Sequence, residues 1–184
     1  MSTRTKIILA TVLVALGVAG RLMPHAWNFT PIIAIGLFAG AYLGPRFAFI
    51  VPVTAMVVSD IFIGFYAWQM NATVYAAMAL SGLLGLAIRN RKNPVSIGLA
   101  AMAGSTLFFF ITNAAVWFFG SSYAPGIEGL TASLVAGLPF FRNALAGDIW
   151  YSWSLFGAYG LVTYGVRYLR LRAQTNKTHN RSLI

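Results

Sequence analysis

The chain contains no cysteine and few charged residues, and both shortages restrict what the protein can be. Without cysteine it can form no disulfide, offer no thiolate to a metal and use no cysteine nucleophile. Only 9% of its 184 residues are charged, whereas 59% are hydrophobic and the mean hydropathy is +0.75. Soluble domains carry roughly a quarter charged residues. This composition therefore indicates an integral membrane protein.

Acidic residues are especially scarce, and the basic surplus is confined to short stretches. Three acidic residues stand against 13 Lys and Arg, which gives a formal net charge of +10. The basic residues flank apolar segments at 4–6, 89–92 and 167–181. That placement orients helices in a bilayer and differs from the basic stripe that binds phosphates. We therefore expect a multi-pass protein of the bacterial cytoplasmic (inner) membrane with cytoplasmic termini, and no nucleic-acid partner.

Motifs for common chemistries are also missing. No glycine-rich phosphate-binding loop is present, and the acidic residues have no nearby histidine arrangement for nucleophilic catalysis. No second His or Cys lies near His25, so a metal site is not expected there. We predict that the protein is not an enzyme and needs no cofactor.

Six apolar segments predict an all-α bundle of six transmembrane helices, at residues 6–19, 31–43, 46–66, 73–88, 95–119 and 145–169. A short helix over 131–138 is expected to stop at Pro139 before the last span. Residues 1–170 would form a single membrane domain, and 171–184 a basic cytoplasmic tail. The first segment is also similar to a signal peptide, but we expect it to remain as the first helix.

Two segments carry small residues four positions apart, a spacing that lets helices approach closely. These residues are Thr11, Ala15 and Ala19 in the first segment, and Gly36, Gly40 and Gly44 in the second. The glycines predict close helix packing. The first stripe fits equally well with packing inside the bundle or with docking against a partner protein.

Four polar stretches interrupt the apolar segments: 21–31, Asp60, Asn113 and 142–148. In the six-span topology all four lie in the outer third of the same side of the membrane. An ionisable group at that depth costs a few kcal/mol unless it is paired or hydrated, so it is a functional candidate. The structural alternative is that an aspartate pairs with Arg21 or Arg142 and only holds helices together.

We predict that these stretches form a site for a small solute from outside the cell. The candidate binding residues are His25, Asn28, Asp60, Asn113, Trp117, Arg142, Asp148 and Tyr151. The aspartates would bind donor groups of the solute or carry a coupling proton, and Arg142 or Arg21 would bind an anionic group. Amides would add neutral hydrogen bonds, and the aromatic side chains would flank a ring.

Several strings carry a resemblance to a known family: RLMPHAWNFTPI, Ser59-Asp60 before Ile63-Gly64-Phe65, Thr112-Asn113 with Trp117, Tyr123-Ala124-Pro125, and LPFFRNALAGDIWY. They resemble a bacterial family of uncharacterised small membrane proteins described as transport proteins. The resemblance covers about residues 21–157 and gives no substrate.

More loosely, the chain is similar to the substrate-binding S-components of energy-coupling-factor vitamin transporters. That resemblance implies six helices, cytoplasmic termini and an outward-facing pocket. It also implies that the stripe of Thr11, Ala15 and Ala19 meets an energy-coupling transmembrane subunit that works with ATPases. The expected function is uptake of a vitamin-like solute. The alternative is a non-transporting membrane scaffold or assembly factor.

Overall fold

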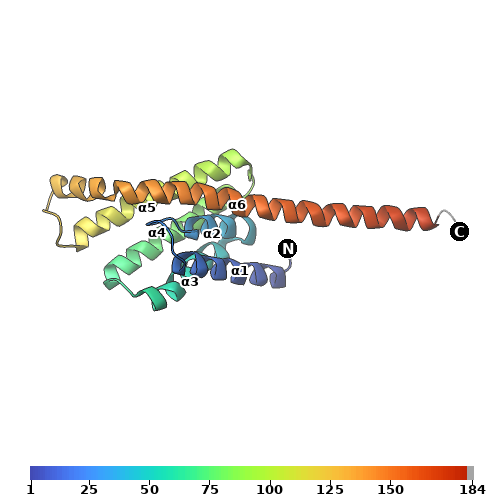
Figure 1. The fold of residues 1–184 in the computed structure, drawn as a ribbon, viewed down its shortest axis with the longest axis horizontal. Coiled ribbons are helices and arrows are strands. Elements are labelled where there is room, and N and C mark those ends of the chain that lie inside the picture. Colours follow the sequence, from blue (N-terminus) through green and yellow to red (C-terminus); the bar gives the residue numbers. More distant parts are fainter. Residues whose placement is uncertain (182–184) are drawn as a thin grey trace.

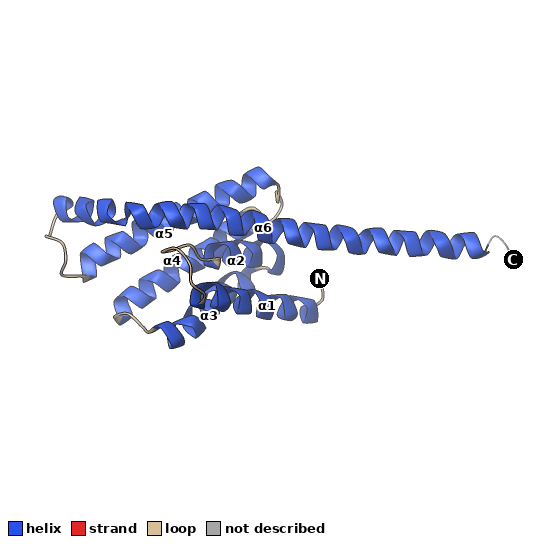
Figure 2. Ribbon diagram, viewed as in Figure 1, coloured by secondary structure: helices blue, strands red, loops and turns tan. Residues whose placement is uncertain are grey.

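The computed structural model describes the backbone of residues 1–181, together with the side chains up to residue 172 and that of Gln174. All regular elements in this part are helical (Figure 2), which confirms the all-α class. They are α1 (Thr3–Leu22), α2 (Ile32–Phe38) with its π-helical continuation η1 (Ala39–Leu43), α3 (Pro45–Ile63), α4 (Trp68–Ala87), α5 (Pro94–Phe119) and α6 (Ile127–Arg181).

Four of these helices, α1, α3, α4 and α5, are long and apolar enough to cross a membrane. The segment Ile32–Leu43 is apolar but short, and α6 is long but is not among the helices that are apolar enough to be candidate spans. The structure is therefore that of a multi-pass membrane protein with four candidate spans.

The short segment formed by α2 and η1 is the centre of the bundle. All residues from 31 to 41 are buried, and α3, α4 and α6 pack around them. Contact with α4 depends on glycine: a Cβ atom on Gly40 would lie 2.2 Å from the carbonyl oxygen of Gly82, and one on Gly85 would lie 2.2 Å from that of Leu37. The prediction of close packing is confirmed here.

Gly44 does not continue this packing surface, so that part of the prediction was wrong. Its φ angle is +104°, a conformation that favours glycine, and a Cβ atom there would meet open space. Gly44 instead ends η1 and turns the chain into Pro45 at the start of α3.

The last helix differs most from the prediction. We expected a short helix ending at Pro139 and a separate span from residue 145, but α6 is continuous from Ile127 to Arg181 and includes Pro139. A proline removes one hydrogen bond from the helix. Here α6 packs against α5 both before and after Pro139, which stabilises the helix through the proline. Gly137 lies against Asn113, and the rings of Phe141 and Phe109 are 4.8 Å apart.

Beyond the bundle, α6 continues alone toward the C-terminus (Figure 1) and enters the predicted basic tail. Helical backbone extends to Arg181, and residues 182–184 of that tail lie outside the described residues.

The N-terminus, the loop between α4 and α5 and the middle of α6 meet at one end of the bundle. The Tyr159 hydroxyl donates to Met1 Sδ at 3.6 Å, and the rings of Tyr159 and Tyr42 are 4.6 Å apart. Lys92 Nζ lies 5.2 Å above the Tyr42 ring. Figure 1 shows that the C-terminal end of α6 projects from this same end. We call it the basic end, because residues 4–6, 89–92 and 167–172 belong to it.

Helix α1 packs on the bundle through a different face from the one that carries its small-residue stripe. The helix buries Ala10, Leu13 and Gly17, and a Cβ atom on Gly17 would lie 2.8 Å from that of Ala55 in α3. Thr11, Ala15 and Ala19 are exposed on another face. The stripe therefore does not pack inside the described bundle, and its docking against a partner protein stays a prediction.

Candidate functional site

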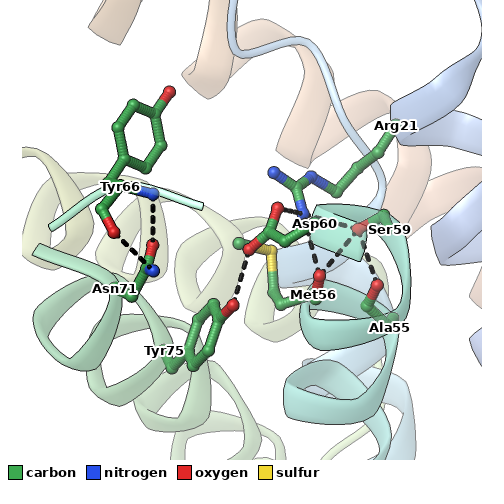
Figure 3. A network of polar contacts seen from close by, with 8 residues as sticks. All are labelled: Arg21, Ala55, Met56, Ser59, Asp60, Tyr66, Asn71 and Tyr75. Carbon is green, nitrogen blue, oxygen red and sulfur yellow. Dashed lines mark hydrogen bonds and ion pairs between the residues drawn. The ribbon is translucent and has the colours of Figure 1, made fainter. Parts of the chain in front are cut away.

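Asp60 forms a buried ion pair with Arg21 at the end of the bundle opposite the basic end. Arg21 Nη1, in the last turn of α1, donates to Asp60 Oδ1 at 2.6 Å, to Ser59 Oγ at 2.5 Å and to the Met56 carbonyl oxygen at 3.2 Å (Figure 3). Asp60 is 2% exposed. The pairing of an aspartate with Arg21 is thus confirmed. Because α3 ends at Ile63, Asp60 lies one turn from the helix end, closer than predicted.

A third helix joins this pair. The hydroxyl of Tyr75 in α4 donates to Asp60 Oδ2 at 2.7 Å, so both carboxylate oxygens have a donor (Figure 3). One turn earlier, the side chain of Asn71 bonds the backbone of Tyr66 through both its oxygen and its nitrogen. These contacts position the start of α4 against α3. Nothing in the sequence singled out Tyr75, because a tyrosine within an apolar segment has many other uses.

Asp148 has different surroundings. It lies about six turns into α6, not near the start of a span as predicted, and is 3% exposed. The Ser105 hydroxyl of α5 donates to its Oδ2 atom at 2.5 Å. Within the described part of the chain no Lys or Arg side chain forms an ion pair with Asp148, since Arg21 pairs with Asp60. Arg142, the other predicted partner, is exposed.

Both aspartates line one cavity of about 590 Å³, to which all six helices contribute. Its polar wall comprises Arg21, His25, Asn28, Thr30, Asp60, Tyr66, Asn71, Thr112 and Asp148. Its apolar wall comprises Trp27, Ile33, Met56, Ile63, Met70, Val74, Met78, Phe108, Val116 and Ala144. The cavity therefore joins a few polar groups to a largely apolar lining.

A second cavity of about 300 Å³ lies beside the first, between α5 and α6. The two share the lining residues Asn28, Phe108, Thr112, Val116 and Ala144. Asn28 has a φ angle of +60° in the turn closed by the bond from Phe29 N to the Ala26 carbonyl oxygen. Asparagine tolerates this left-handed conformation better than most residues, and the turn places Asn28 at the boundary between the cavities.

The structure brings together five of the eight predicted binding residues. His25, Asn28, Asp60 and Asp148 line the larger cavity, while Asn28 and Asn113 line the second. The other three, Trp117, Arg142 and Tyr151, line neither. Among the described residues, no three His, Cys, Asp or Glu side chains are grouped so as to hold a metal ion.

Two of these three side chains, those of Trp117 and Tyr151, contact loops instead. Trp117 Nε1 donates to the Ala124 carbonyl oxygen at 3.1 Å and so holds the loop between α5 and α6. Tyr151 packs on Phe29, with ring centroids 5.4 Å apart, and Trp27 packs on Phe140 at 5.8 Å. These contacts hold the stretch 23–31 against α6, and residues of this stretch line both cavities.

Fold and site together define an all-helical, multi-pass membrane protein with a partly polar cavity surrounded by its helices. A family model described as a family of unknown function, DUF6580, matches residues 1–171, and the chain belongs to this family. No curated protein and no solved structure matches the chain.

Proposed function

We propose that the protein binds a small, vitamin-sized solute and takes it up across the bacterial inner membrane. The observation that carries this proposal is the cavity of about 590 Å³ in which two buried aspartates, from α3 and α6, face a mostly apolar lining. Small-molecule sites have this size range and this combination of apolar walls with few polar groups.

The side from which the solute enters follows from the charges. The basic end carries residues 4–6, 89–92 and 167–172, and such clusters remain in the cytoplasm. The cavity is lined by the last turns of α1 and α3 and the first turns of α4, which lie at the opposite end. It therefore opens outward, with the Ile32–Leu43 segment and α6 as the two further spans of a six-span topology.

Release of the solute inward requires either movement of the whole bundle or rearrangement of the loops. The exposed small residues Thr11, Ala15 and Ala19 would let an energy-coupling transmembrane subunit with its ATPases approach α1 closely. A solitary protein would instead move the stretch 23–31, which aromatic contacts hold against α6.

The direct test is uptake and binding with a broad panel of radiolabelled vitamins and similar solutes, including cations, anions and neutral molecules. Cells that express the protein should accumulate at least one of them, and the purified protein should bind it. If no member of the panel is bound or taken up, the proposal is wrong.

A scaffold or assembly role is the second candidate, and the network of Arg21, Asp60 and Tyr75 favours it because it links three helices. Alanine at Asp148 separates the two functions. A scaffold predicts that only helix association changes, and that no solute binding exists to be lost. A solute site predicts that Asp148→Ala abolishes binding while the fold remains.

A further inference from the structure

We infer that the solute carries a positively charged nitrogen, which binds against the carboxylate of Asp148. This inference rests on the proposed function, because it names the chemical class of the molecule that the cavity would take. It is carried by the charges on the cavity walls, the burial of Asp148 and the lining that surrounds it.

The charges on the walls of the larger cavity do not balance. Its Lys, Arg, Asp and Glu residues are Arg21, Asp60 and Asp148, and His25 is exposed at the cavity wall. Arg21 and Asp60 neutralise each other at 2.6 Å. The second cavity is lined by no Lys, Arg, Asp or Glu. Among the described residues, the carboxylate of Asp148 is therefore left without an opposite charge.

Burial makes this imbalance costly in the absence of a solute. Asp148 is 3% exposed, and a neutral hydroxyl, that of Ser105, is its recorded hydrogen-bond donor. A carboxylate removed from water requires a cation or a proton. Arg142 is on the same helix but exposed, so it does not supply the charge. A cationic solute would supply it from inside the cavity.

The rest of the lining indicates what the charged nitrogen would be attached to. Aromatic and aliphatic side chains, including Trp27, Tyr66, Phe108 and Met78, line the same space. Aromatic faces attract cations and also accept flat rings. Phe108 and Thr112 line both cavities, so the second cavity lies next to the space that an apolar body would fill. The fitting class is an amine or quaternary ammonium on an apolar or aromatic body.

The test uses one ring system in three charge states: tryptamine as the cation, tryptophol as the neutral molecule and indole-3-acetate as the anion. Binding to the purified protein is measured by calorimetry at constant pH and salt. We expect tryptamine to bind most tightly. Asp148→Asn, which keeps the shape and can still accept from Ser105, should weaken tryptamine binding at least about 30-fold and leave tryptophol unchanged.

Glu128→Gln is the matched control, because Glu128 is also on α6 but is exposed and lines neither cavity. It removes the same charge and should not alter tryptamine binding. Comparison of the three probes on the unaltered protein does not depend on any variant, so it remains decisive if Asp148→Asn does not fold.

Two results would overturn the inference while the proposed function stands. One is equal or tighter binding of tryptophol or indole-3-acetate, and the other is tryptamine binding that survives Asp148→Asn. If none of the three binds but a neutral or anionic solute of the broad panel does, the inference is also overturned and the uptake function remains. If nothing in the panel binds, both are wrong.

Discussion

Arg21 Nη1 lies 2.6 Å from Asp60 Oδ1, so a cation at the end of α1 neutralises the carboxylate of α3. Asp148, equally buried, has no such partner among the described residues and accepts from the Ser105 hydroxyl. The two aspartates therefore have different physical roles, although both line one cavity. Asp60 links α3 to α1, whereas Asp148 lines the cavity beside a neutral donor.

Asp60→Ala should destabilise the protein strongly, because it leaves the Arg21 guanidinium partly buried without its counter-charge. Loss of one partner from a buried pair costs about 3–5 kcal/mol. Thermal unfolding in detergent should show a clear drop in Tm, whereas Glu128→Gln, which removes an exposed charge, should show none. Unchanged stability of Asp60→Ala would mean that the pair contributes nothing to the fold.

Tyr75→Phe removes the hydroxyl that donates to Asp60 Oδ2 at 2.7 Å and leaves the ring in place. A hydrogen bond to a charged group contributes about 1.5–3 kcal/mol, so the loss should be smaller than for Asp60→Ala. Combined with Asp60→Asn, the two effects should not add, because both act on one contact. Simple additivity of the two losses in unfolding experiments would contradict the direct interaction.

Much of the architecture could be predicted from composition and periodicity. The long apolar segments correspond to α1, α3, α4 and α5, and the basic loop ends where Asn93 caps α5 through Ser96 N. The cost of an isolated charge in the membrane also gave the pairing of an aspartate with Arg21 or Arg142 as the structural alternative, without deciding which aspartate or which arginine. These features depend on local chemistry, which a single sequence displays.

Other features depend on tertiary packing and could not be predicted. Pro139 predicts the end of a helix, but α5 contacts α6 before and after this proline, and α6 continues through it. Tyr151 and Trp117 lie among the expected polar groups in sequence, yet each lies one helical turn after a residue of the cavity lining, Asp148 or Asn113, and contacts a loop instead. Which turns of a helix border a cavity is set by the neighbouring elements.

Gly82→Ala should disrupt the contact between α4 and α3. The added Cβ atom would lie 2.0 Å from the Ala48 carbonyl oxygen, and backbone cannot rotate away as a side chain can. Overpacking of this kind costs about 1–3 kcal/mol or more. Gly157→Ala is the control, because nothing lies within 4 Å of its Cβ position and alanine favours a helix. The Tm should fall in the first variant and not in the second.

Ser152→Ala should leave the protein as stable as before or make it more stable. Ser152 lies one turn after Asp148 on α6, is fully buried, and its Oγ atom has no hydrogen-bond partner within the described part of the chain. A buried unsatisfied polar group costs about 1–3 kcal/mol, which alanine removes. Ser105→Ala is the opposite case, because it deletes the hydroxyl that donates to Asp148 Oδ2 and should lower the Tm. If Ser152→Ala lowers the Tm as much as Ser105→Ala does, the Ser152 hydroxyl must bind a group, such as an internal water molecule, that stabilises α6 at the cavity.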